Sequence, residues 1–494
     1  MFTYILKYNP IIFISCWTLC SMFMVMFMIP SHFNNLTKSF ATISSSLVFL
    51  MTLNMWLCFD SFTSLFQFTC TFSFMPYLNL TYSTGMDGIS LFFLILTTFT
   101  MTVCMLISWN TIQFFLKEYL VCFLVTELCL IQVFCITDMF WFYVFFESVT
   151  IPMFLMIGIW GSRERKTRAA IQFFLFTLMG SFFMTVALIF IYSVMGTTNL
   201  LILWFIDFPK NTQLILWLGF FFGFAVKVPM LPFHMWLPEA HAEAPTSGSV
   251  ILAGMTLKLG GYGFLRFSTP LFPFANVYFS PLVFLLSLLA IVYGSLTTLR
   301  QIDLKKMIAY SSMSHMGFVT LGIFSLNVNG IEGSIILMLS HGLISSALFF
   351  CVGITYDRHH TRILKYYSGT VQVMPIFVIF FSFFSFANIG LPGTSSFIGE
   401  FLILNSLLKV SFVLTSLATL GIVLSASYAI WLVNRISFNT LKIHYFSFFQ
   451  DVSRREFIIL LLFSFTTSWV GTCPGSFLNE INFSVLNLIE HLTV

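Results

Sequence analysis

Residues 214–236 read LILWLGFFFGFAVKVPMLPFHMW, and residues 248–268 read GSVILAGMTLKLGGYGFLRFS. Both stretches are long and apolar enough to cross a bilayer, because a membrane helix needs about 20 predominantly apolar residues. Each nevertheless carries a lysine, Lys227 in the first and Lys258 in the second. A charged side chain at membrane depth costs about 2.5–3.5 kcal/mol on insertion scales, which makes it a candidate for function. These stretches therefore predict both the class of fold and the place of the site.

The composition of the whole chain predicts a membrane protein. Of its 494 residues, 58% are hydrophobic and 8% are charged, and the mean hydropathy is +0.96. A soluble domain carries about 25% charged residues. No polar stretch is long enough for a soluble nucleotide, haem or flavin domain. The positive charges lie singly in short loops, which argues against nucleic-acid binding.

The sequence predicts an all-α, polytopic fold with about 14 transmembrane helices. The seventh candidate helix carries Pro229 and Pro232, and the twelfth is interrupted by Gly390, Pro392 and Gly393. Because proline removes an amide donor and clashes with the preceding turn, both helices are expected to be discontinuous. The approximate limits of the candidates are 11–29, 42–59, 89–109, 117–137, 139–160, 168–195, 214–236, 248–268, 276–298, 307–326, 332–355, 373–406, 411–436 and 456–473.

Lys and Arg residues are distributed unevenly between the two sides of this predicted bundle. Sixteen of the 22 fall in loops after odd-numbered helices, and two lie within helices. Loops rich in Lys and Arg face the negative compartment, so both chain ends are expected on the opposite side. The four on that opposite side are Lys7, Lys210, Arg266 and Lys409.

Helices four to eight and nine to thirteen show a related pattern, since each group contains a broken helix with an ionisable side chain. Paired broken helices are typical of transporters built on an inverted repeat, which predicts two inverted five-helix repeats. The chain then divides into four parts. These are N-terminal helices at 1–110, a first half-channel repeat at 111–270, a second at 271–440, and a C-terminal helix with its tail at 441–494.

Four ionisable groups, Glu147, Lys227, Lys258 and Glu400, lie within four of the predicted helices. A buried Lys–Glu pair whose separation varies can act as a proton switch, because desolvation and an opposite charge favour opposite protonation states. Lysine suits this task better than arginine, which does not deprotonate. A static ion pair is the alternative for Glu147 and Lys227 alone. The whole set, with two of its helices broken, favours a proton path.

Two histidines in apolar helices, His315 and His341, are the remaining candidates for this path. A lone histidine in a membrane helix is often only a hydrogen-bonded core group, and both have serine neighbours. An imidazole near its ordinary pKa can also relay protons. We therefore include both in the predicted path. The ten cysteines form no C-x-x-C pair and lie mostly in apolar runs, so no metal site is expected.

Several motifs give the chain a recognisable pattern. They are KVPMLPFHMWLPEAHAEAPTSGSVILAGMTLKLGGYG at 227–263, FYVFFESVTIPMF around Glu147, IAYSSMSHMGFV around His315 and LPGTSSFIGEF around Glu400, with GMDGISLFFLILTTF from residue 85. This pattern resembles the antiporter-like, proton-translocating subunits of respiratory complex I. It is closer to NADH dehydrogenase subunit 4 than to the sister subunits 2 and 5. The resemblance covers about residues 85–440.

The resemblance implies a proton-pumping subunit of NADH:ubiquinone oxidoreductase, a translocase with no redox chemistry in this chain. By the family pattern, Glu147 and Lys227 are the modulating pair and Lys258 is the central relay lysine. His315 lies beside the axis, and Glu400 stands where the sister subunits have lysine. The NADH, flavin mononucleotide (FMN), iron–sulfur and ubiquinone sites lie on partner subunits, so no cofactor is expected here.

The same resemblance implies the location and the partners. We expect a multi-pass protein of the mitochondrial inner membrane, surrounded by lipids, with both termini on the intermembrane-space side. The extreme phenylalanine content, 66 residues, suggests an organelle-encoded gene. Other membrane-arm subunits, especially the subunit 2-like and subunit 5-like chains, are the expected partners. A Na⁺/H⁺ antiporter subunit of the same superfamily and a structural membrane scaffold are the alternatives.

Overall fold

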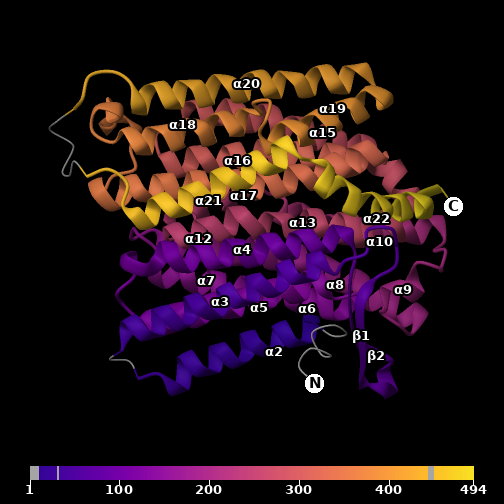
Figure 1. Ribbon diagram of the computed structural model, residues 1–494. Helices are drawn as coiled ribbons and strands as arrows, with labels where there is room; N and C mark the ends of the chain where they lie inside the picture. Colours follow the sequence, from indigo (N-terminus) through magenta and orange to yellow (C-terminus); the bar gives the residue numbers. More distant parts are fainter. Residues whose placement is uncertain (1–9, 31–32, 443–449, 494) are drawn as a thin grey trace.

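A computed structural model describes residues 10–30, 33–442 and 450–493 of the chain (Figure 1). Long helices lie alongside one another and make up most of the molecule. Within the described ranges, eleven helices are long and apolar enough to cross a membrane, and one bent pair brings the number to as many as twelve. The candidates at 214–236 and 373–406 are divided in the structure, as predicted. The total of fourteen spans stays a prediction.

The N-terminal part combines three long helices with a β-hairpin. The hairpin strands are antiparallel and occupy part of the segment before the third helix, where the sequence had given no recognisable pattern. The hairpin projects beyond the ends of the neighbouring helices (Figure 1). The elements are α2 (Pro10–Phe23, extended by a π turn at Met24–Met28), α3 (Asn34–Leu57), β1 (Gln67–Met75), β2 (Leu80–Met86) and α4 (Gly88–Thr111).

The first predicted repeat contains the break at Lys227. The helix α10 ends at this residue, and the chain resumes a helix only at Trp236, after the two prolines. The elements are α5 (Leu116–Cys135), α6 (Met139–Ser148), α7 (Thr150–Trp160), α8 (Lys166–Met195), α9 (Leu200–Leu203), α10 (Lys210–Lys227), α11 (Trp236–Glu243), α12 (Thr246–Ile251), a π turn η3 (Leu252–Thr256), α13 (Leu257–Gly263), a second π turn η4 (Phe264–Ser268) and α14 (Thr269–Leu271).

The second predicted repeat contains the other break, between α18 and α19. The C-terminal helices α21 and α22 follow it and meet at a bend of 65°. Only α21 had been expected as a helix, because α22 lies in the predicted tail. The elements are α15 (Pro273–Arg300), α16 (Leu304–Phe324), α17 (Val328–His359), α18 (Pro375–Ile389), α19 (Ser395–Val410), α20 (Phe412–Ser437), α21 (Arg454–Thr472) and α22 (Gly475–Thr493).

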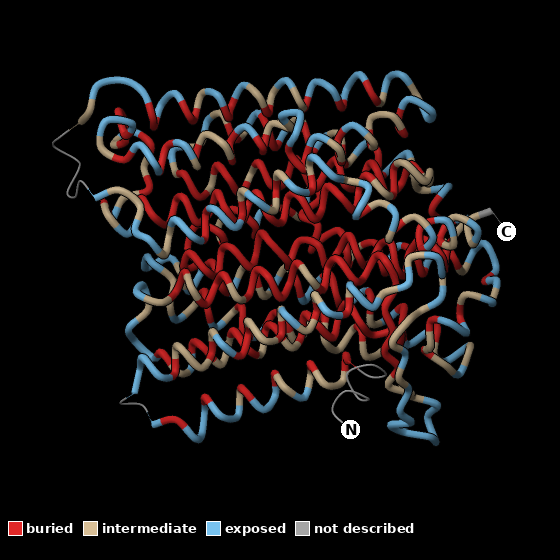
Figure 2. Tube along the Cα trace, in the orientation of Figure 1, coloured by how far each residue is buried: buried red, intermediate tan, exposed pale blue. Residues whose placement is uncertain are grey.

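The core of the molecule lies along two helices in the middle of the bundle. The most apolar windows of the span Thr246–Leu271, which comprises α12 to α14, and of α17 are entirely buried. Figure 2 shows this buried centre, with exposed residues concentrated on the outer helices. The outer helix α20 has only a third of its window buried, as a helix facing lipid would. The two buried helices carry Lys258 and His341, so these polar side chains lie far from any surface.

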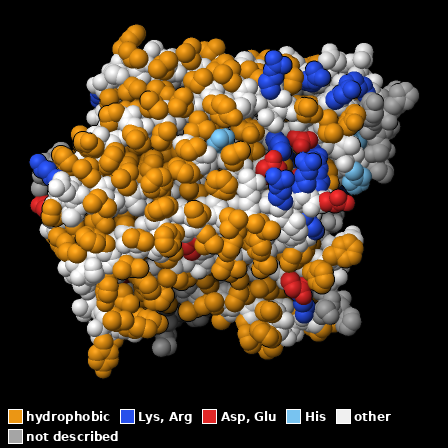
Figure 3. Space-filling view, turned by 180° about the vertical axis from the view of Figure 1, so that it is seen from behind, with side chains coloured by type: hydrophobic (Ala, Val, Ile, Leu, Met, Phe, Trp, Pro, Cys, Tyr) orange, Lys and Arg blue, Asp and Glu red, His pale blue; other side chains and the backbone are white. Residues whose placement is uncertain are grey.

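Charged side chains gather at one end of the helices. Seen from behind, most of the visible Lys, Arg, Asp and Glu side chains lie at that end, and hydrophobic side chains cover much of the remaining surface (Figure 3). This agrees with the predicted uneven distribution of Lys and Arg. Arg266, which lies near the end of the predicted helix 248–268, is inside the span of α12 to α14 with only 2% of its surface exposed.

A buried ion pair explains the position of Arg266. Its guanidinium donates to both carboxylate oxygens of Asp87, at 2.8 Å and 2.6 Å. Asp87 also caps α4 by accepting from the backbone amide of Ser90. Burial alone would raise the pKa of Asp87, but the charge and hydrogen bonds of Arg266 hold this pKa below its ordinary value. The pair fastens α4 to the central buried helix.

Replacing Asp87 with asparagine is expected to lower the stability of the protein by about 3–5 kcal/mol, because it leaves the Arg266 guanidinium buried without a counter-charge. Thermal unfolding of the protein in detergent measures the change. Asp207→Asn, which removes an exposed acid near α9, is the matched control and should be nearly neutral. Equal effects of the two variants would show that the ion pair contributes nothing specific.

Candidate functional site

Lys258 lies at the centre of the buried helix between two π turns. Its ammonium group donates to the carbonyl of Ala253, which belongs to the preceding π turn η3. Its Nζ also lies 2.9 Å from Nδ1 of His341 on α17. Lys258 is completely buried and His341 is 3% exposed. π turns occur often at functional sites because they disturb the regular backbone hydrogen bonding.

Two histidines continue from Lys258 towards the second broken helix. The ring centres of His341 and His315 are 5.7 Å apart. On its other side, His315 Nδ1 lies 3.4 Å from Oε1 of Glu400. Both His315 and Glu400 are buried. Lys258, His341, His315 and Glu400 therefore form one series of neighbouring groups, to which α13, α17, α16 and α19 each contribute a member.

The break between α18 and α19 is shaped around Glu400. Gly390, which follows α18, has a φ of +90°, a conformation that side chains rarely adopt. A Cβ at this position would lie 2.8 Å from Oε2 of Glu400. The backbone conformation therefore favours glycine, and the absence of a side chain leaves room for the carboxylate of Glu400. The interruption predicted from Gly390, Pro392 and Gly393 thus places backbone against an acid of the site.

The other two predicted residues, Lys227 and Glu147, do not form an ion pair in the structure. Lys227 is buried and Glu147 is half-buried, yet within the described ranges they do not approach to ion-pair distance. The ammonium group of Lys227 instead lies 4.8 Å from the centre of the Phe146 ring, next to Glu147 in the chain. Among the described residues, neither carboxylate oxygen of Glu147 has a partner at hydrogen-bond distance. The pair is open.

Glycines bring the helix of Lys227 close to the helix of Lys258. A Cβ on Gly260 would lie 2.5 Å from Val228, the residue after Lys227. A Cβ on Gly263 would overlap the ring of Phe224. These contacts explain the glycines of the motif LKLGGYG as positions of close packing. The two lysines thus lie on adjoining helices.

Two further buried ionisable residues, His241 and Glu127, were not predicted as part of the site. His241, on α11, is completely buried and stacks on Phe349, with 4.8 Å between ring centres. Its ring nitrogens have no hydrogen-bond partner among the described residues. The same holds for both carboxylate oxygens of Glu127 on α5. Glu127 lies in the apolar stretch 117–137, which indicated that it would be buried. His241 lies in the more polar stretch LPEAHAEAP, which did not indicate burial.

Lys258, His341, His315 and Glu400 are arranged one after another and do not surround a common point. In the described residues, no cluster of three or more His, Cys, Asp or Glu side chains is arranged to hold a metal ion. Successive groups instead lie within about one hydrogen bond or one water molecule of each other, which suits the passage of protons.

Comparisons with known proteins agree with the geometry. Residues 137–426 match the family model described as NADH:quinone oxidoreductase/Mrp antiporter, transmembrane region. The chain is 60% identical to NADH-ubiquinone oxidoreductase chain 4 of Chondrus crispus, over 98% of each chain.

Two solved structures share the fold. A chain of respiratory complex I from Thermus thermophilus matches with a TM-score of 0.88 and 27% identity, covering 98% of this chain and 99% of that one. A chain of the Mrp complex from Dietzia sp. matches with a TM-score of 0.82 and 19% identity, covering 96% of this chain and 52% of that one, and this likeness concerns the fold alone. The resemblance seen in the motifs is confirmed: the chain belongs to the chain 4 family of NADH-ubiquinone oxidoreductase, among the antiporter-like membrane subunits.

Proposed function

We propose that this chain moves protons within the membrane arm of an NADH:ubiquinone oxidoreductase, using energy from electron transfer in other subunits. The observation that carries the proposal is the buried series Lys258, His341, His315 and Glu400. Each member is a group that can gain and lose a proton. The name of the relatives supports the coupling to NADH oxidation and ubiquinone reduction.

Lys258 is the central station of the proposed path. Its polar partners are a carbonyl and an imidazole, and no carboxylate of the described residues pairs with it. A buried ammonium without a counter-charge bears the full cost of desolvation, whereas the neutral amine does not. Burial therefore favours release of the proton from Lys258, and His341, at 2.9 Å, is the neighbouring group positioned to receive it. A modest ring rotation or one bridging water carries it across to His315 and then to Glu400.

Glu147 and Lys227 set the occupancy of that station. When the pair is closed, the ammonium of Lys227 is neutralised by Glu147. When the pair is open, as in this structure, the positive charge of Lys227 acts on Lys258 across the glycine-packed contact of α10 with α13. Repulsion between like charges raises the energy of a proton on Lys258. Opening and closing of the pair would thus empty and refill the central lysine.

The names of the relatives support a proposal for the setting of this chain. We propose that the chain lies in the mitochondrial inner membrane beside the subunit 2-like and subunit 5-like chains, with both termini in the intermembrane space. NADH, FMN, the iron–sulfur clusters and ubiquinone would be held by partner subunits. The charged end of the molecule would then face the matrix, as the distribution of Lys and Arg favours.

Replacing Lys227 with methionine tests the proposed function. Proton transfer through this chain should fall about tenfold, within the range of a coupling free energy of 1–3 kcal/mol. Proton movement into sealed vesicles, per NADH oxidised by the assembled complex, measures the effect. Lys210→Met, at the exposed opposite end of α10, is the matched control.

Two results would decide against the proposal. A structural scaffold predicts unchanged proton movement in Lys227→Met once the complex has assembled. A Na⁺/H⁺ antiporter predicts that proton movement depends on sodium and that the chain purifies without flavin and iron–sulfur subunits. The proposal requires the opposite in both cases: a sodium-independent loss, and co-purification with the redox subunits.

A further inference from the structure

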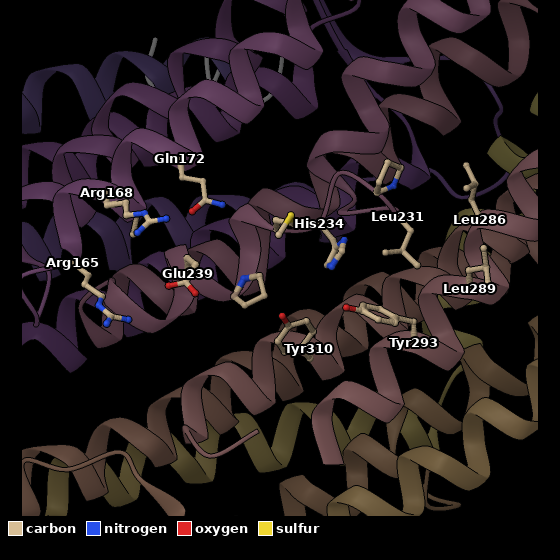
Figure 4. Close-up of a pocket in the computed structure, with 14 residues that line it drawn as sticks. Arg165, Arg168, Gln172, Leu231, His234, Glu239, Leu286, Leu289, Tyr293 and Tyr310 are labelled. Carbon is tan, nitrogen blue, oxygen red and sulfur yellow. The ribbon is translucent and has the colours of Figure 1, made fainter. Parts of the chain in front are cut away.

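A cavity of about 830 Å³ lies outside the proposed proton path, between α8, α11, α15 and α16 (Figure 4). We call it the α8–α15 cavity. Its volume is in the range of sites that hold small molecules. One part of its wall is the segment that follows the break at Lys227, represented by Leu231 and His234.

One end of the α8–α15 cavity is basic. Arg165 and Arg168, at the start of α8, line this end, with Gln172 one turn further along (Figure 4). Neither arginine forms an ion pair within the described ranges. The acid that also lines the cavity, Glu239, is engaged by Lys306 at 2.6 Å. The N-terminus of the 30-residue helix α8 adds its own positive dipole, so this end attracts anions.

The other end of the cavity is apolar and reaches into the membrane. Leu286 and Leu289 of α15 line it, and Leu289 is 49% exposed. Leu286 lies 14 residues before Arg300, the end of α15, and therefore about 21 Å from that end. The side chain of Tyr293 lies between the basic and the apolar parts. The cavity is thus amphiphilic along the direction of the helices.

Both ends are placed correctly for a lipid. The loop before α8 and the loop after α15 lie at the same end of the molecule, because Arg163 and Asp303 form an ion pair of 3.4 Å between them. The arginines therefore stand at the level of headgroups, and the leucines at the level of acyl chains.

We propose that the α8–α15 cavity binds an anionic phospholipid, with its phosphate on Arg165 and Arg168 and an acyl chain along Leu289 and Leu286. Basic pockets between membrane helices on the negative side of a membrane are suited to such headgroups. A bound lipid would fill the space between the first and second predicted repeats and contact the segment after Lys227. This site is separate from proton transfer and does not depend on the proposed function.

The experiment uses the intact complex, delipidated in mild detergent and titrated with phosphatidylglycerol or with phosphatidylcholine of the same chains. Mass spectrometry of the intact complex counts the bound lipids. In Arg165→Ala/Arg168→Ala, binding of one phosphatidylglycerol should weaken about 25-fold, as expected from two headgroup contacts. Arg300→Ala/Arg454→Ala removes two exposed charges outside the cavity and is the matched control.

A second pair of variants separates a lipid from free phosphate. Leu289→Trp should fill the apolar end and abolish the same binding event, whereas Leu285→Trp, exposed on the same helix but outside the cavity, should not. If only the arginine variant acted, and inorganic phosphate competed, the ligand would be a free anion and the lipid proposal would be wrong. Equal binding of phosphatidylcholine, equal loss in the controls, or loss of a neighbouring subunit instead of a lipid would also overturn it.

Discussion

Replacing Lys258 with methionine is expected to reduce proton transfer through this chain by about 100-fold, the lower end of the range for a positioned proton-transfer group. Methionine fills a similar volume but holds no proton, so His341 loses its donor across the 2.9 Å contact. Proton movement into sealed vesicles containing the assembled complex measures the effect. The fold should survive, because the substitution removes a buried charge rather than breaking an ion pair.

Two further variants show whether proton release from Lys258 is what matters. Lys258→Arg keeps the positive charge but does not deprotonate, so it should be as inactive as Lys258→Met. Lys409→Met removes an exposed lysine at the end of α19 and should leave proton movement unchanged. If Lys258→Arg retained full activity, Lys258 would act only as a fixed charge.

Glu400→Gln is expected to have an effect of similar size, on the order of 100-fold. The amide fits the space beside Gly390 but cannot accept a proton from His315, whose Nδ1 lies 3.4 Å from the carboxylate. Proton transfer should therefore halt after the histidines. The same vesicle measurement applies, with Glu164→Gln in the exposed loop before α8 as the control.

A double-mutant cycle tests whether Glu400 and His315 act in the same proton path. If His315 and Glu400 act in series, His315→Ala combined with Glu400→Gln should be little worse than either change alone. Losses that multiplied would indicate independent roles and would contradict a single path through both residues.

Much of the fold was predictable from the sequence because a membrane imposes simple rules. Length and apolarity located the helices, and prolines located the break after Lys227. The hairpin of β1 and β2 and the helix α22 were not predicted, since their residues are neither uniformly apolar nor part of a familiar motif. The ion pair of Arg266 was not predicted either, because its partner Asp87 is 179 residues away in the chain. Sequence position alone does not reveal such a pair.

The candidate site was predictable as a set of residues but not as an arrangement. Lys227 and Lys258 were predicted as site residues because a charged side chain inside a membrane helix is costly to bury. Nothing in the sequence showed that His341, rather than His315, would contact Lys258, since both histidines have similar neighbours. The burial of His241 was also hidden, because stacking on Phe349 depends on the packing of α11 against a distant helix.

The two π turns that flank Lys258 have a mechanical consequence. In a π turn the backbone hydrogen bond spans five residues, whereas in an α-helix it spans four. Each π turn therefore contains one extra residue, which corresponds to about 100° of rotation about the helix axis. If one turn tightened while the other widened, α13 would rotate as a unit and the helix ends would stay where they are packed. Lys258 would then swing away from His341 without any helix leaving the bundle.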